Sequence, residues 1–229
     1  MNDESGPMAA RQIPGCPSGE GGQGAAPAPE GAPAAPKPPP GSTRKPRADA
    51  QRNREKLLAA AAAIFAQGGP EASLEAVARR AGLGIGTLYR HFPTREALFQ
   101  AVYRREAEEL ATLAAELGRS NDPVEALRRW LHAAVRMVAT KRGMAAALSP
   151  SLQADDPVFA EVRAHLLDSI AALLAQGAQA GALRAEIQAQ DILRAMLGFC
   201  YAPGMGEDWQ DVAIRLLDVF VDGLRAPAS

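Results

Sequence analysis

Hydroxyl and guanidinium side chains recur between residues 73 and 95, at spacings that place several of them on one surface. Ser73 stands before a helix-like segment, and Thr87, Tyr89 and Arg90 lie close together in the next one. Such side chains hydrogen-bond to phosphate oxygens and to base edges in the DNA major groove. The chemistry that this stretch offers is therefore recognition of a nucleic acid.

A helix-turn-helix positions such side chains by crossing two short helices at a steep angle, which requires particular residues at fixed spacing. The small Ala78 stands where the helices must touch, and Gly82, four positions later, tolerates the positive φ of the turn. Leu88, six positions further on, anchors the second helix. Three other apolar residues complete the expected core: Val77, Ala81 and Leu83. The three matches together predict a helix-turn-helix.

Charge is distributed unevenly along the chain, although the formal net charge is only −1. Residues 44–105 contain 12 Lys/Arg against 5 Asp/Glu, whereas residues 106–229 contain 11 against 17. A basic segment joined to an acidic one indicates that only the first meets a polyanion.

Three segments are predicted from composition and periodicity. Residues 1–43 contain 18 Gly or Pro and no apolar periodicity, so we expect a disordered tail. Residues 44–104 are expected to form the DNA-binding domain, and residues 105–229 a helical effector-binding and dimerisation domain. Ala and Leu dominate the apolar residues, and strand formers are scarce, which predicts an all-α fold.

Nine helices are expected, with their ends set by capping residues. A basic arm of Arg44, Lys45 and Arg47 should precede a first helix capped by Asp49. Ser73 and Thr94 are the expected caps of the second and fourth helices. After Arg142 we expect a short separate helix that ends before residue 149.

The segments Gly84-Ile85-Gly86-Thr87-Leu88-Tyr89-Arg90-His91-Phe92 and Thr94-Arg95-Glu96-Ala97-Leu98 resemble the recognition helix and fourth helix of the TetR family of repressors. The resemblance covers about residues 53–103, and 142–202 are faintly similar to a regulatory domain common in that family. It implies an operator-binding homodimer in which Arg95 holds the DNA backbone. The residues expected to contact DNA are Arg44, Lys45, Arg47, Ser73, Ile85, Gly86, Thr87, Tyr89, Arg90, His91 and Arg95.

The sequence departs from the family's richer DNA readers because Ile85-Gly86 offers no amide or guanidinium at the start of the recognition helix. Recognition of the operator sequence is then expected to depend on few direct contacts to bases, with Ile85 against a thymine methyl group. Alternatives stay open: Tyr89 as a packed aromatic, His91 as a capping group, and the basic arm as a solvated tail. Phe92 is expected in the core.

The acidic half is expected to enclose an apolar pocket for a small, apolar effector. The candidates are Trp130, His132, Met137, Met144, Phe159, His165, Met196, Phe199, Cys200 and Tyr201, each of which can equally be core. Two broad apolar helical faces near the C-terminus predict a four-helix dimer interface. Its candidates are Leu193, Leu197, Val212, Leu216 and Phe220. Twofold symmetry predicts a palindromic operator with half-sites about 34–36 Å apart.

Other classes of protein fit less well. The three histidines form no recognisable motif with a nucleophile or acid, and no phosphate loop or metal-ligand spacing occurs, so we expect neither an enzyme nor a metal or other cofactor. Two distant cysteines, Cys16 and Cys200, fit a reducing cytoplasm. The N-terminus does not resemble a secretory signal, and the longest apolar run, 57–66, is too short to span a membrane. A sequence-tolerant nucleic-acid binder and an activator remain as alternatives.

Overall fold

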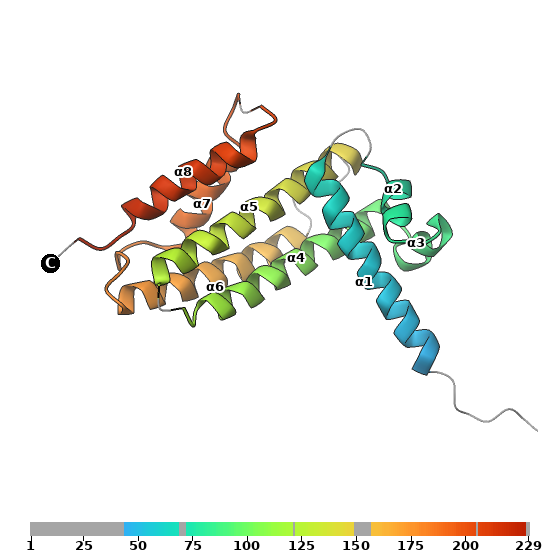
Figure 1. The fold of residues 1–229 in the computed structure, drawn as a ribbon, viewed down its shortest axis with the longest axis horizontal. Helices are drawn as coiled ribbons and strands as arrows, with labels where there is room; N and C mark the ends of the chain where they lie inside the picture. Colours follow the sequence, from blue (N-terminus) through green and yellow to red (C-terminus); the bar gives the residue numbers. More distant parts are fainter. Residues whose placement is uncertain (1–43, 69–71, 121, 149–156, 205, 228–229) are drawn as a thin grey trace, which may run out of the picture. The chain divides into compact units, whose positions relative to one another are not determined.

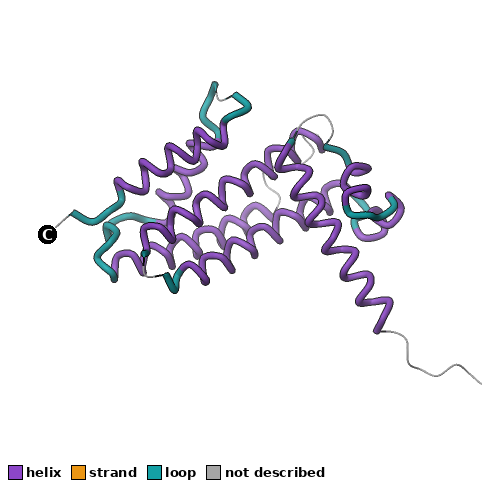
Figure 2. Tube along the Cα trace, viewed as in Figure 1, coloured by secondary structure: helices purple, strands orange, loops and turns teal. Residues whose placement is uncertain are grey.

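The computed structural model describes residues 44–68, 72–120, 122–148, 157–204 and 206–227, and these residues form eight α-helices (Figure 1). The helices are α1 (Arg44–Gln67), α2 (Leu74–Arg80), α3 (Ile85–His91), α4 (Arg95–Leu117), α5 (Pro123–Leu148), α6 (Pro157–Gln179), α7 (Ala189–Cys200) and α8 (Trp209–Gly223). Within these ranges no strand occurs, and Leu183 and Arg225 form an isolated antiparallel bridge (Figure 2). The expected all-α fold is confirmed, and the predicted tail lies outside the described residues.

Helices α1 to α4 surround a small apolar core. Leu57 and Phe65 of α1, Val77 of α2, Leu88 of α3 and Leu98 of α4 are all fully buried there. Helices α2 and α3 have only seven residues each, too few for a helix that is stable alone, so packing against α1 and α4 holds α3 in place.

A second core lies between the far half of α4 and helices α5 to α8. In Figure 1, α4, α5 and α6 run side by side, and α7 and α8 lie along this group. Trp130 of α5 is fully buried, and its indole Nε1 donates a hydrogen bond of 2.9 Å to the carbonyl of Leu110. No described helix combines the length and hydropathy of a membrane span.

Two predicted caps are confirmed. The Ser73 hydroxyl accepts a hydrogen bond of 3.1 Å from the Ala76 amide, and Thr94 accepts one of the same length from Ala97. Each hydroxyl satisfies an amide that has no partner within the first turn of its helix.

The predicted start of the first helix is wrong. Helix α1 begins at Arg44, so Asp49 lies inside it and pairs with Arg52, one turn later, instead of capping it. The backbone of the expected basic arm is therefore part of the helix. Arg47 is exposed there.

The predicted short helix after Arg142 is also wrong, because α5 continues without a break through Gly143 to Leu148. Glycine commonly weakens a helix, but here it permits a close contact. A Cβ atom at Gly143 would lie 1.8 Å from the carbonyl oxygen of Phe65 in α1. Only a residue without a side chain allows α1 and α5 to pack this closely.

Candidate nucleic-acid interface and effector cavity

The turn between α2 and α3 has the geometry that its residues predict. Gly82 has a φ of +68°, in the left-handed region that other residues rarely adopt. Ala78 and Leu88 are buried, and the amide of Leu83 donates a hydrogen bond of 2.9 Å to the carbonyl of Ala78. The turn thereby fixes the direction in which α3 leaves the core.

Helix α3 presents its outer face to solvent. Tyr89 is 42% exposed and Ile85 is 37% exposed, whereas Leu88 between them is buried. Gly86 and Arg90 are exposed and Thr87 is half-buried. The neighbouring side chains can therefore reach a ligand in front of α3 without disturbing the core.

Basic and hydroxyl groups flank this outer face. Arg95 is exposed in the first turn of α4, and His91 is half-buried at the end of α3, beside the ring of Phe92. Phe92 is buried, as expected, with the guanidinium of Arg54 4.8 Å from its ring centroid. Ser73 uses its oxygen as the α2 cap, which leaves its hydroxyl proton able to donate to a phosphate.

A cavity of about 250 Å³ lies in the second core, between α4, α5, α6 and α7. Its wall is mainly apolar but includes three cationic side chains. The lining residues are Tyr103, Ala134, Met137, Val138, Lys141, Phe159, Arg163, Leu166, Leu193, Arg194, Met196, Leu197 and Tyr201.

The cavity brings together four of the expected pocket residues, namely Met137, Phe159, Met196 and Tyr201. The other candidates do not line it, for different physical reasons. Trp130 and Cys200 are fully buried in the core, and burial raises the pKa of the Cys200 thiol to about 11, against a smaller opposing effect of Arg142. Met144 packs in the core around α3. His165 is exposed, Phe199 packs on Phe220, and His132 pairs with Asp218.

The sequence analysis missed the cations of this cavity and Tyr103. Lys141 lies one helical turn after Met137 and two turns after Ala134, on the inward face of α5. A lone lysine in an apolar stripe was the available signal. Its Nζ atom is 4.4 Å from the ring centroid of Phe159 and 5.6 Å from that of Tyr103.

Glu106 lies one turn after Tyr103 on α4 and is half-buried. One carboxyl oxygen accepts a hydrogen bond of 2.8 Å from the Thr140 hydroxyl, and the other is buried and has no hydrogen-bond partner among the described residues. Burial raises the pKa of Glu106 to about 7, although the bond from Thr140 acts in the opposite direction. The protonated form of this side chain is therefore more favourable in the folded protein than in the unfolded chain.

Replacing Glu106 by Gln should make the protein more stable at pH 8 but not at pH 4.5. Below the ordinary pKa of 4.5 the carboxyl is neutral in both states, and stability declines as pH rises toward 7 because only the folded state resists ionisation. Urea unfolding should show a gain on the order of 2 kcal/mol at pH 8. Glu116→Gln, at an exposed position on the same helix, is the control. Parallel pH profiles for wild type and Glu106→Gln would contradict the assignment.

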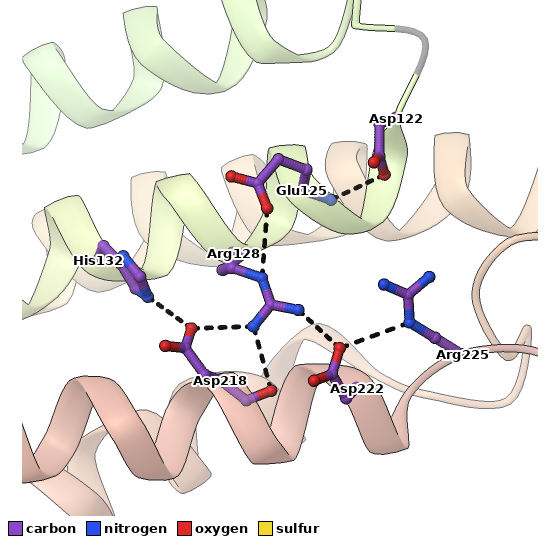
Figure 3. Close-up of polar contacts among 7 residues, drawn as sticks. All are labelled: Asp122, Glu125, Arg128, His132, Asp218, Asp222 and Arg225. Carbon is purple, nitrogen blue, oxygen red and sulfur yellow. Dashed lines mark hydrogen bonds and ion pairs between the residues drawn. The ribbon is translucent and has the colours of Figure 1, made fainter.

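A polar cluster fastens α8 to α5 (Figure 3). Arg128 of α5 pairs with Asp218 at 2.9 Å and with Asp222 at 2.7 Å, and Asp218 also lies 2.8 Å from the Nε2 atom of His132. Burial acts to raise the pKa of Asp218, but the hydrogen bonds from Arg128 and His132 outweigh it and lower the pKa. The cluster fixes one edge of α8 against the protomer.

The opposite edge of α8 is apolar and partly exposed, and of its residues Phe220 packs on Phe199 of α7. Val212, Leu216, Val219 and Phe220 lie on one face at helical spacing, and Val219 is 73% exposed. Leu197 of α7 is also exposed, whereas Leu193 is 4% exposed and belongs to the core and the cavity wall. The structure therefore buries Leu193 within the protomer, and it exposes Val219, which the sequence analysis did not name, on the apolar edge of α8.

Four consecutive residues of α5 contact different parts of the molecule. Lys141 lines the cavity, and Arg142 donates a hydrogen bond of 2.8 Å to the carbonyl of Cys200 and stacks on Trp209. Gly143 lies against Phe65 of α1, and Met144 is buried in the core that holds α3. A displacement of this segment would change contacts in the cavity, with α7 and α8, and in the core that holds the helix-turn-helix.

Comparison with known proteins agrees with this architecture. Residues 57–102 match the family "Bacterial regulatory proteins, tetR family", and residues 122–226 match "Transcriptional regulator SbtR-like, C-terminal domain". The TetR transcriptional regulator SCO0520 from Streptomyces coelicolor is 39% identical, with a TM-score of 0.65, over 76% of this chain and 99% of that one.

Two curated regulators are also similar. The repressor BepR from Brucella suis is 29% identical over 81% of this chain and 98% of its own length. The regulator UidR from Escherichia coli is 35% identical, but the match spans only 38% of UidR and 34% of this chain. Both are described as helix-turn-helix regulators of transcription. The family matches and the full-length likeness to SCO0520 establish that the chain belongs to the TetR family.

Proposed function

We propose that the chain is a cytoplasmic, ligand-responsive repressor that binds a palindromic operator as a homodimer and is released by a small molecule. The observation that supports it most directly is the exposed outer face of α3, which a buried Leu88 and the Gly82 turn hold rigidly. This face belongs to residues 44–105, in which 12 Lys/Arg stand against 5 Asp/Glu. Such a helix suits the major groove, and the surrounding cations suit the phosphates.

Each predicted DNA contact has a role in this proposal. Ile85, Gly86, Thr87 and Tyr89 face the base edges or nearby phosphates from α3. Arg90, His91, Arg95 and Ser73 hold the backbone on either side, and Arg44, Lys45 and Arg47 contact phosphates from the first turn of α1. Because α1 is helical from Arg44, these last three contacts would come from a helix end and not from an extended arm.

Repression is relieved, in this proposal, when a ligand in the cavity displaces the segment 141–144 of α5. That segment contacts both the cavity and α1, so two positions of α5 would correspond to two separations of the DNA-reading heads. A ligand shifts this equilibrium only by binding one of the two states more tightly. The dimer forms through the apolar faces of α7 and α8, with Leu197, Val212, Leu216, Val219 and Phe220 at the contact.

The test is a fluorescence-anisotropy titration of the full chain against duplexes from its own upstream region and a scrambled duplex, at rising salt. A specific repressor keeps its preference at physiological salt and binds two protomers per site. Binding that is equal for both duplexes and lost with salt would indicate a sequence-tolerant binder. A genome-wide site selection would then decide whether an operator lies elsewhere.

Tyr89→Ala should weaken operator binding about tenfold and leave the fold intact, because the side chain is largely outside the core. Anisotropy gives the affinity, and circular dichroism with thermal unfolding gives the stability. Tyr89→Phe separates the two parts of the side chain: loss in both variants assigns the contact to the hydroxyl. A fall in the unfolding temperature of Tyr89→Ala by more than a few degrees would show instead that Tyr89 packs the domain.

A further inference from the structure

The cavity combines an apolar wall with three basic side chains. Lys141, Arg163 and Arg194 line it, and no aspartate or glutamate of the described residues does. Arg194 is 3.3 Å from Asp191, but neither Lys141 nor Arg163 forms an ion pair within the described part of the chain. Among the residues that the structure describes, these two cations of the cavity have no acidic partner.

Lys141 is the cation set deepest. It is half-buried, whereas Arg163 and Arg194 are exposed and so stand where the cavity meets solvent. The aromatic rings of Phe159 and Tyr103 lie close to its ammonium group, and burial lowers the pKa of that group. An ammonium group removed from water is stabilised strongly by an anion that occupies the same space.

The rest of the wall favours a hydrocarbon. Met137, Leu166 and Met196 line the cavity from three different helices, and methionine side chains adapt to apolar ligands of varied shape. The volume, about 250 Å³, lies just below the usual range of drug-sized pockets, which is roughly 300–1,000 Å³. The ligand must therefore be small.

We infer that the effector is a small amphipathic anion, with its carboxylate on Lys141 and its hydrocarbon tail among Met137, Leu166 and Met196. The inference rests on the proposed function, since it names the ligand class of the proposed effector site. It replaces the purely apolar effector that the sequence suggested. The exposed Arg163 and Arg194 attract the anion to the entrance, and Lys141 pairs with it inside.

The test compares three eight-carbon probes whose head groups are negatively charged, neutral and positively charged. Octanoate, octan-1-ol and octylammonium are titrated into the full-length protein by isothermal calorimetry, without DNA. Octanoate should bind at least about tenfold more tightly than octan-1-ol, and octylammonium should not bind measurably. In Lys141→Met, which keeps the apolar stem, octanoate should lose about tenfold in affinity while octan-1-ol is unchanged.

Lys56→Met is the matched control, because Lys56 is exposed on α1 away from the cavity. Equal affinity for octanoate and octan-1-ol in the wild type, or no binding of octanoate, would overturn the inference even if a variant fails to fold. An equal loss for both probes in Lys141→Met would overturn it as well.

The same probes are then added to the operator complex in the anisotropy assay. Tight octanoate binding without release of the operator supports the ligand class and contradicts ligand-controlled repression. Release by octan-1-ol as readily as by octanoate supports ligand control and overturns the anionic ligand class.

Discussion

Gly143→Ala should lower the free energy of unfolding by about 3 kcal/mol and weaken operator binding more than tenfold. The added Cβ would lie 1.8 Å from the carbonyl oxygen of Phe65, and a backbone atom cannot move aside as a flexible side chain can. Helices α1 and α5 must then separate by more than 1 Å, which disturbs the core that positions α3. Urea unfolding and operator anisotropy measure the two effects.

The matched control is Gly223→Ala, at the last residue of α8, where a Cβ atom meets nothing within 4 Å. This change should alter stability by less than about 0.5 kcal/mol. If Gly143→Ala were as stable as Gly223→Ala, α1 and α5 would not pack as closely as the structure has them. If Gly143→Ala lost stability but kept full operator affinity, the segment 141–144 would not couple α5 to the DNA-reading head.

Gly143 also explains one limit of prediction from the sequence. A glycine after two basic residues looks like a helix end when only local propensity is considered. The close approach of α1 decides otherwise, and that contact joins residues nearly eighty positions apart. The same is true of Asp49, which has the side chain of a cap but pairs with Arg52 inside a longer helix.

The helix-turn-helix was predictable because its requirements are local. Ala78, Gly82 and Leu88 meet a fixed spacing, and in the structure Ala78 and Leu88 are buried and Gly82 has the positive φ of the turn. The caps Ser73 and Thr94 are likewise determined by the amides three residues later.

The cavity was less predictable because residues from four helices line it. Large apolar side chains such as Trp130 and Phe159 look alike in the sequence, yet one anchors the core through its hydrogen bond to Leu110 and the other lines the cavity. Lys141 was the stronger signal, since a charged residue on an inward helical face requires a reason. Leu193 and Leu197 differ by one turn of α7, and only the packing of α7 against α6 and α8 distinguishes the buried residue from the exposed one.

Leu216→Asp should convert the dimer to monomers and reduce operator affinity by more than about a hundredfold. A monomer binds a single half-site and loses the affinity that two linked DNA-binding domains gain by binding both half-sites together. Leu216 is 41% exposed in the protomer and lies between Val212 and Val219 on the apolar edge of α8, so a carboxylate there leaves the protomer core intact. In the dimer the same carboxylate would be buried without a partner. Sedimentation equilibrium gives the oligomeric state, and circular dichroism confirms the fold. Arg129→Asp, which places a carboxylate at an exposed position of α5 outside that edge, should remain a dimer. If Leu216→Asp also remained a dimer, the dimer interface would lie on another surface of the protomer. The ion pairs of Arg128 with Asp218 and Asp222 hold α8 so that Leu216 faces solvent, and a dimer that used the apolar edge would therefore have to bury the new carboxylate.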